Sequence, residues 1–217
     1  MLSSRVGVVL TILLLAACRS VPFPEYTVLE DESARHAMHA RLVEYALSPN
    51  TIHRAALSIR GEELIVTLLM ELEAPDSFKL AAVTDLGVTL FSATRNAEGM
   101  EIHQVGPGMP ERFLRDYLIP DLAAGCLTPT LNDCELVQLE GESRALHYRL
   151  SSDDVLLHDD PASGPIRLER GRAGRSWAVL NKSVGSNVGA GSTALSIVNQ
   201  DGLYRARIEI AAWGSGH

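Results

Sequence analysis

Short segments in which apolar and polar residues alternate dominate the chain after Thr51, and they restrict it to a sheet-rich fold. In Glu63–Glu73 every second residue from Leu64 to Leu72 is apolar, which places these side chains on one face of a strand. Three more strands are expected to follow as a meander, with a positive-φ turn at Gly99. These strands are Ser77–Asp85, Val88–Arg95 and Met100–Val105.

Strand-like segments return in the second half of the chain, after the cysteine-containing loop. They are Glu135–Leu139, Ser143–Leu150, Ile166–Glu169, Trp177–Leu180, Thr193–Val198 and Leu203–Ala211. Asp201–Gly202 lies between the last two and is a strong hairpin signal. The Gly-rich stretch Ser183–Ser192 lacks the GK[ST] ending of a phosphate-binding loop, so we expect a hairpin loop there.

Two helices interrupt this strand pattern. Asp31–Leu47 has apolar residues at helical spacing and is followed by Ser48–Pro49–Asn50 as a stop signal. Pro110–Leu122 carries an apolar stripe, Pro110 suits a first helical position, and Pro120 marks an end or a kink. Runs of strands with two inserted helices predict an α+β domain dominated by an antiparallel sheet.

The first 18 residues have the pattern of an export signal. Arg5 precedes an apolar run from Val6 to Ala17, which is too short to span a bilayer as a helix. Leu15-Ala16-Ala17-Cys18 resembles the lipobox of bacterial lipoproteins, in which the cysteine is acylated and the preceding peptide is removed. The resemblance predicts a signal peptide over residues 1–17, lipidation of Cys18 and a tether over 18–30. Arg19 after the cysteine favours the periplasmic face of the outer membrane.

Composition narrows the function classes further. The 217-residue chain has a formal charge of −8, and removing the 17 leader residues, with Arg5, leaves 200 residues at −9. An acidic chain without Lys/Arg clusters is not expected to bind nucleic acid. One hydrophobic core is expected over residues 31–217, because the sequence shows no repeat and no second core.

With Cys18 predicted to be lipidated, two cysteines remain, Cys126 and Cys134. The compartment expected for an exported protein is oxidising. The two cysteines are separated by seven residues that include Pro129, Asn132 and Asp133. We expect them to form a disulfide that closes a short surface loop. Metal binding or catalysis by these thiols is the less favoured alternative, since no histidine lies at ligand spacing.

No motif in the chain predicts catalysis, a metal or a cofactor. His36 and His39 are three residues apart on the first helix but have no nearby third ligand, and His158-Asp159-Asp160 is typical of an acidic turn. A nucleophile elbow is absent from the sequence. We therefore expect a protein that is not an enzyme, in which the apolar residues carry the function.

The order of elements resembles a family of bacterial outer-membrane lipoproteins of unknown function whose fold is similar to that of the lipoprotein carriers LolA and LolB. Two segments carry the resemblance: Leu80–Phe91, ending Asp85-Leu86-Gly87-Val88-Thr89-Leu90-Phe91, and the helix opening Pro110-Glu111-Arg112-Phe113-Leu114-Arg115-Asp116. The resemblance implies an unclosed antiparallel β-barrel covered by helices, with an apolar cavity for acyl chains. The residues expected to line it, or to fill the core instead, are Leu68, Met70, Leu90, Phe91, Phe113, Tyr117 and Leu118. The sequence offers no exposed apolar loop tip like the one that in LolB enters the membrane.

These observations favour a lipid-anchored protein whose domain binds a lipid or a lipid-linked cargo and passes it on without covalent chemistry. The expected partners are the membrane, through the N-terminal lipid, the cargo itself and an envelope protein. A non-catalytic scaffold of an envelope complex and a hydrolase with a dispersed site remain open as alternatives.

Overall fold

A computed structural model describes residues 21–44, 51–59, 61–74, 77–96, 99–158, 166–184 and 193–209. Residues 1–20, with the predicted leader and Cys18, lie outside these ranges, as does most of the Gly-rich stretch. Among the described residues, no helix combines the length and the apolarity needed to cross a bilayer.

The described strands form one antiparallel sheet of 13 strands that does not close. Its order is β1-β7-β8-β9-β10-β11-β12-β13-β2-β3-β4-β5-β6, so β1 and β6 are the two edges. The strands are β1 Tyr26–Val28, β2 Thr51–Ile59, β3 Glu62–Ala74, β4 Ser77–Thr84, β5 Thr89–Asn96, β6 Gly99–Val105, β7 Cys134–Leu139, β8 Arg144–Leu150, β9 Asp153–His158, β10 Ile166–Arg172, β11 Arg175–Val184, β12 Thr193–Asn199 and β13 Tyr204–Glu209. The predicted antiparallel sheet is confirmed, and so is the hairpin at Asp201–Gly202, which joins β12 to β13.

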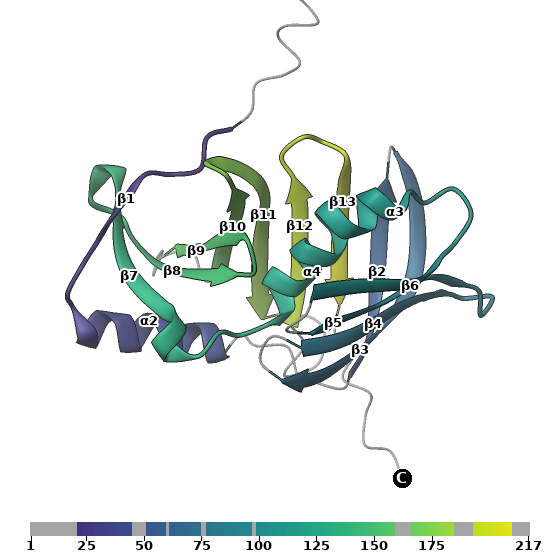
Figure 1. The fold of residues 1–217 in the computed structure, drawn as a ribbon, viewed down its shortest axis with the longest axis horizontal. Coiled ribbons are helices and arrows are strands. Elements are labelled where there is room, and N and C mark those ends of the chain that lie inside the picture. Colours follow the sequence, from purple (N-terminus) through teal and green to yellow (C-terminus); the bar gives the residue numbers. More distant parts are fainter. Residues whose placement is uncertain are drawn as a thin grey trace, which may run out of the picture.

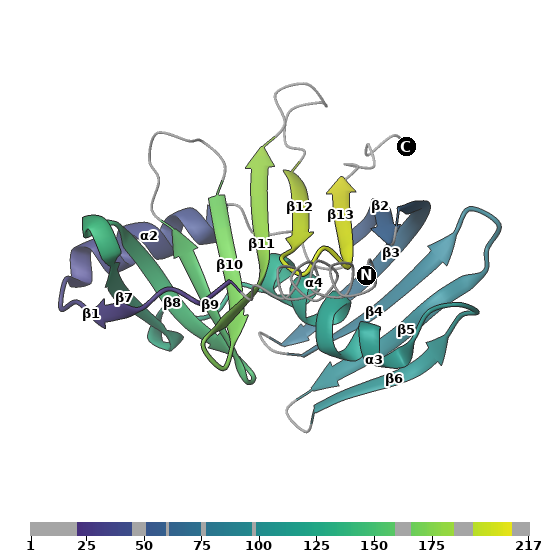
Figure 2. The same cartoon turned by 90° about the horizontal axis from the view of Figure 1, so that it is seen from above.

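The sheet curves so that its two ends face each other across a helix. Figure 2 shows β1 and β7–β10 on one side, β2–β6 on the other, and the helical segment labelled α3 and α4 between them. The side chains of β3 alternate between the two faces of the sheet as predicted. Val66 and Leu68 are buried in the core, whereas Leu69, which lies between Leu68 and Met70, is exposed. Helix α2, Glu32–Glu44, packs against β7 and β8 outside this central space (Figure 1).

The central helix extends beyond its predicted end. Helix α3, Glu111–Phe113, a π-helical turn at Leu114–Leu118 and helix α4, Ile119–Cys126, follow one another without interruption. Pro120 has no amide hydrogen and would break a regular helix in its interior. The preceding π-turn, in which the Ile119 amide donates to the Leu114 carbonyl, places Pro120 in the first turn of α4, where that missing donor is tolerated. Pro120 therefore neither ends the helix nor separates its two parts.

Helix α4 is buried along its whole length and lies against β10 and β11. Gly125 permits this close approach, because a Cβ atom at this position would collide with Leu195 on β12 and press against Leu180 on β11. Such contact explains why every residue from Ile119 to Cys126 is buried although the segment contains the charged Asp121.

A buried network of charges fixes helix α4 to the sheet. The Arg170 guanidinium on β10 is fully buried between Asp121 of α4 and Asp153 of β9, with 2.7 Å between Arg170 Nη1 and Asp153 Oδ2. The Tyr204 hydroxyl on β13 donates a hydrogen bond to Asp121. Burial alone would lower the pKa of Arg170, but the two carboxylates raise it above its ordinary value, so the guanidinium stays charged.

Strand β9 is absent from the sequence-based prediction because it carries Asp153, a charged residue of this buried network. The pair Asp153–Asp154 suggests a polar turn, but Asp153 is only 2% exposed because it is an acceptor for Arg170 and for Arg172. Buried carboxylates in strands are rare unless paired, and the partners here, Arg170 and Arg172, lie on β10, 17 and 19 residues further along the chain.

Residues 21–30, predicted to be a tether, contact the sheet instead. Tyr26–Val28 pairs with β7, and the Phe23 amide donates to the Gly174 carbonyl at 2.9 Å. The Phe23 ring occupies the space over Gly171, where a Cβ atom would collide with it. Two prolines made the sequence of this stretch unlike that of a strand. Pro22 is nevertheless compatible with an edge of the sheet, because its missing amide hydrogen removes no hydrogen bond between strands there.

The predicted disulfide between Cys126 and Cys134 is not formed, and both residues are buried free thiols. Cys126 ends helix α4 in the interior beside Lys182, whereas Cys134 begins β7 and donates from Sγ to the Thr130 carbonyl at 3.3 Å. Burial raises the pKa of both thiols to about 12, so neither is a thiolate at neutral pH.

We expect Arg170→Met to lower the free energy of unfolding by about 3–5 kcal/mol, because it leaves Asp121 and Asp153 buried without a cation. The matched control is Arg167→Met on the same strand, where the side chain is exposed and a change below about 0.5 kcal/mol is expected. Urea unfolding followed by circular dichroism measures both, and equal effects would contradict the role assigned to Arg170.

Candidate functional site

An apolar pocket of about 730 Å³ opens at one end of the sheet. Its walls come from the end of β2, the start of β3, the start of β5, the loop 106–110, the first turns of the central helix and the turn before β13. The apolar side chains that line it are Ile59, Leu64, Leu90, Met109, Phe113, Tyr117 and Leu203. Glu62 and Arg112 contribute the two charged groups of the lining.

The loop 106–110 closes one wall of this pocket. Gly106 donates its amide to the Leu90 carbonyl at 2.6 Å, and a Cβ atom at this glycine would lie 2.9 Å from the same oxygen. Gly108, with φ of 81°, then turns the chain back so that Met109 packs against the core. Pro110 follows as the extended N-cap of the helix and needs no amide partner.

Aromatic rings form a second wall. The rings of Phe113 and Tyr117 are stacked with centroids 6.3 Å apart, and Phe113 meets the Tyr204 ring edge-on at 5.3 Å. Tyr117 in turn contacts Trp177 at 5.0 Å. Because Tyr204 also hydrogen-bonds Asp121, the buried charge network holds this aromatic wall in place. The site is thus a rigid apolar surface rather than a set of reactive groups.

The structure separates the predicted lining residues into two groups. Leu90, Phe113 and Tyr117 line the pocket. Leu68, Phe91 and Leu118 are at most 1% exposed and fill the core, and Met70 is buried with them. Alternation and helical spacing identify which residues face inward, but they do not tell a packed position from one at the mouth of a cavity.

A short loop with an exposed apolar tip is present, contrary to the expectation from sequence. The turn between β4 and β5 holds Leu86 at 91% exposure and Val88 at 53%. Gly87, with φ of 79°, donates its amide to the Thr84 carbonyl at 2.8 Å, which makes the turn tight. The sequence did not reveal this tip, because Leu86 lies between Asp85 and Gly87 and a single leucine in a polar turn produces no periodic pattern.

The apolar tip and the apolar pocket lie at the same end of the sheet. In an antiparallel sheet alternate turns share one end, and the turns β12–β13, β2–β3 and β4–β5 are alternate. The register confirms this, since Ile59 pairs with both Glu62 and Tyr204. Figure 1 shows the first two of these turns side by side next to α3. Leu203, 38% exposed, adds a further apolar side chain to this end.

The histidines that the sequence singled out make ordinary contacts. On helix α2, His36 Nδ1 lies 2.8 Å from the Glu32 carbonyl oxygen, and His39 Nε2 lies 2.9 Å from that of Pro129. His158 pairs with Glu169 at 3.4 Å. The part of the chain that the structure describes contains no cluster of His, Cys, Asp and Glu suited to a metal ion.

Comparison with known proteins assigns no family to the chain. No family model and no curated protein matches it. A crystal structure of a DUF1329 family protein from Desulfovibrio piger ATCC 29098 is similar with a TM-score of 0.44 and 9% sequence identity, over 84% of this chain and 94% of that chain.

Lys182 on β11 is an unusual charge in the core. The side chain is fully buried, and its Nζ has no hydrogen-bond partner among the described residues. Burial lowers the pKa of Lys182 to about 8, against a smaller opposing effect of Cys126. A buried lysine amine without a hydrogen-bond partner lowers the stability of the fold whenever it is protonated.

We expect Lys182→Met to raise the free energy of unfolding by about 3 kcal/mol at pH 7, because a pKa shift from 10.5 to about 8 corresponds to that penalty. The folded-state pKa lies below the unfolded one, so the unfolded chain binds more protons between these values and the wild type gains stability as pH rises. The difference between variant and wild type should therefore shrink from pH 8 to 10.5. Thermal or urea unfolding across this range measures it, and a difference independent of pH would contradict the assignment.

Proposed function

We propose that the protein is an outer-membrane lipoprotein, anchored by acylated Cys18, whose periplasmic domain binds an acyl chain of a lipid or lipid-linked cargo and passes it on. The observation that carries this proposal is the apolar pocket of about 730 Å³ with exposed Leu86 at the same end of the sheet. The mechanism is binding and transfer, without covalent chemistry.

Pocket size and lining support an apolar ligand. Small-molecule sites typically measure about 300–1,000 Å³ and are lined by apolar and aromatic side chains with few polar groups. Leu90, Met109, Phe113 and Tyr117 supply such a lining, and Glu62 and Arg112 balance each other in charge. Transfer of one sixteen-carbon chain from water would contribute about 10 kcal/mol before the entropic cost of binding.

The exposed tip supports delivery at a membrane. A fully exposed leucine gains roughly 1.5–3 kcal/mol on leaving water, which is enough for transient contact with the apolar layer of a bilayer but too little for anchoring. The tight turn at Gly87 holds Leu86 outward, so the residue need not leave the core to reach the membrane. Contact by this tip would bring the mouth of the pocket to the lipid surface.

We expect Met109→Gln to weaken binding of a dansylated fatty acid about tenfold, because an amide replaces apolar contact in the pocket wall. The matched control is Val43→Gln, an exposed apolar position on helix α2 away from the pocket, which should bind like the wild type. Fluorescence titration gives both affinities, with circular dichroism to check folding. No binding by the wild type, or equal loss in both variants, would contradict the apolar site.

We expect Leu86→Asp in a Cys18→Ala chain, which lacks the lipid anchor, to reduce binding to vesicles of phosphatidylethanolamine and phosphatidylglycerol about tenfold. Val43→Asp on helix α2 introduces the same charge at an exposed apolar residue away from the tip and should have little effect. Vesicle co-sedimentation measures the bound fraction. Equal reduction by the two substitutions would attribute the effect to charge repulsion and remove Leu86 from the membrane contact.

A further inference from the structure

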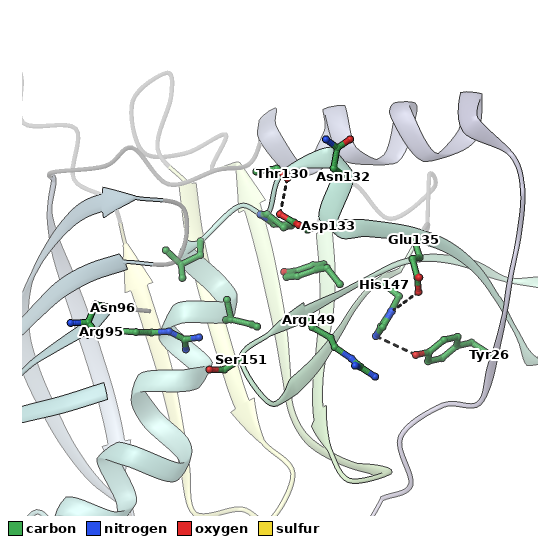
Figure 3. A pocket seen from close by; sticks show the side chains of 14 residues that line it. Tyr26, Arg95, Asn96, Thr130, Asn132, Asp133, Glu135, His147, Arg149 and Ser151 are labelled. Atoms are coloured by element: carbon green, nitrogen blue, oxygen red, sulfur yellow. Dashed lines mark hydrogen bonds and ion pairs between the residues drawn. The ribbon is translucent and has the colours of Figure 1, made fainter. Parts of the chain in front are cut away.

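A second cavity, of about 740 Å³, is polar and lies between the end of β5 and the other half of the sheet, β1, β7 and β8. Leu90, at the start of β5, lines the apolar pocket, whereas Arg95 and Asn96, at the end of the same strand, line the polar cavity. The remaining walls come from β1, the loop 127–133, β7 and β8 (Figure 3). The two cavities therefore differ in the chemistry of their linings.

Charges of both signs line the polar cavity in equal number. Arg95 and Arg149 are matched by Asp133 and Glu135. Local hydrogen bonds hold several of these groups, since Thr130 Oγ1 donates to Asp133 at 2.6 Å and Arg149 Nε donates to Asp154 at 3.3 Å. A balanced lining gives neither anions nor cations an electrostatic advantage, and it favours a neutral polar ligand.

An aromatic wall with fixed orientation borders this cavity. The rings of Tyr26 and His147 lie 4.7 Å apart at 33°. His147 Nε2 is 3.3 Å from the Tyr26 hydroxyl and 3.1 Å from Asp154, and Nδ1 is 3.4 Å from Glu135. Figure 3 shows Tyr26, His147 and Glu135 joined by these contacts. The side chain of His147 is only 5% exposed, so this wall is rigid.

One buried polar atom of the residues that line the cavity has no hydrogen-bond partner within the described part of the chain. It is the hydroxyl oxygen of Tyr148. Buried polar groups are almost always hydrogen-bonded, by water or ligand where protein supplies no partner. Burial raises the pKa of Tyr148, so its hydroxyl stays protonated and remains a donor.

We propose that this polar cavity binds a neutral carbohydrate in the form of a short oligosaccharide. Sugar hydroxyls both donate and accept hydrogen bonds, which matches a lining of amides, hydroxyls, carboxylates and arginines with no net charge. Sugar rings also present apolar C–H faces that pack on aromatic side chains such as Tyr26. The cavity lies within the size range of small-molecule sites. This proposal does not depend on the apolar pocket or its ligand.

The test uses the full chain, purified in a non-glycosidic detergent that cannot compete for the site. Titration calorimetry with chito-, malto- and cello-oligosaccharides should show binding of at least one of them. Inorganic phosphate and a sulfated glycan, as anionic probes, should not bind. Binding of the anionic probes alone, or of none of these sugars, overturns the proposal.

The variant Tyr148→Phe tests whether the sugar binds in the polar cavity. We expect it to weaken sugar binding roughly two- to tenfold while thermal stability stays the same or rises, because the lost hydroxyl has no protein partner. Asn132→Ala, at an exposed residue of the cavity lining, should also weaken binding without affecting the fold. The matched control, Tyr117→Phe in the apolar pocket, should leave sugar affinity unchanged. Wild-type affinity in both Tyr148→Phe and Asn132→Ala would place the sugar elsewhere and overturn the assignment.

Discussion

The ion pairs of Arg170 with Asp121 and Asp153 are the constraint on which the rest of the structure depends. They join the central helix to β9 and β10 inside the core, where an unpaired charge would be expensive. Tyr204 extends the network to β13 and contacts Phe113 with its ring. The position of the helix, and with it one wall of the apolar pocket, is therefore fixed by hydrogen bonds with defined directions rather than by apolar packing alone.

The sheet carries two chemically distinct cavities. Antiparallel pairing sends alternate turns to opposite ends, so the turn that carries Leu86 lies with the apolar pocket and the end of β5 lies with the polar cavity. The helix lies between the two halves of the sheet (Figure 2). Under the proposed function, the end of the sheet that carries Leu86 and the apolar pocket faces the lipid.

Most strands were predictable because one face of each is buried and the other is solvated. The prediction failed where a residue occupies a position that is unusual for its residue type. Asp153 reads as a turn residue until Arg170 is placed beside it, and Pro120 reads as a helix end until the π-turn before it is known. The two cysteines are close in sequence, but Cys126 ends α4 in the core, Cys134 begins β7, and both are buried free thiols. The first of these errors has a distant partner as its cause, whereas the second depends on the helix geometry directly before the proline.

Local pattern by itself determined most strands of the sheet, the presence of both helices and the inward-facing residues, because strand and helix periods are properties of neighbouring residues. The sequence also named three of the seven predicted lining residues that border the apolar pocket, Leu90, Phe113 and Tyr117. Only the tertiary structure decided which inward positions meet a packed neighbour and which meet space. That decision rests on how closely the central helix approaches the sheet, which Gly125 and the buried charges set across long distances in the chain.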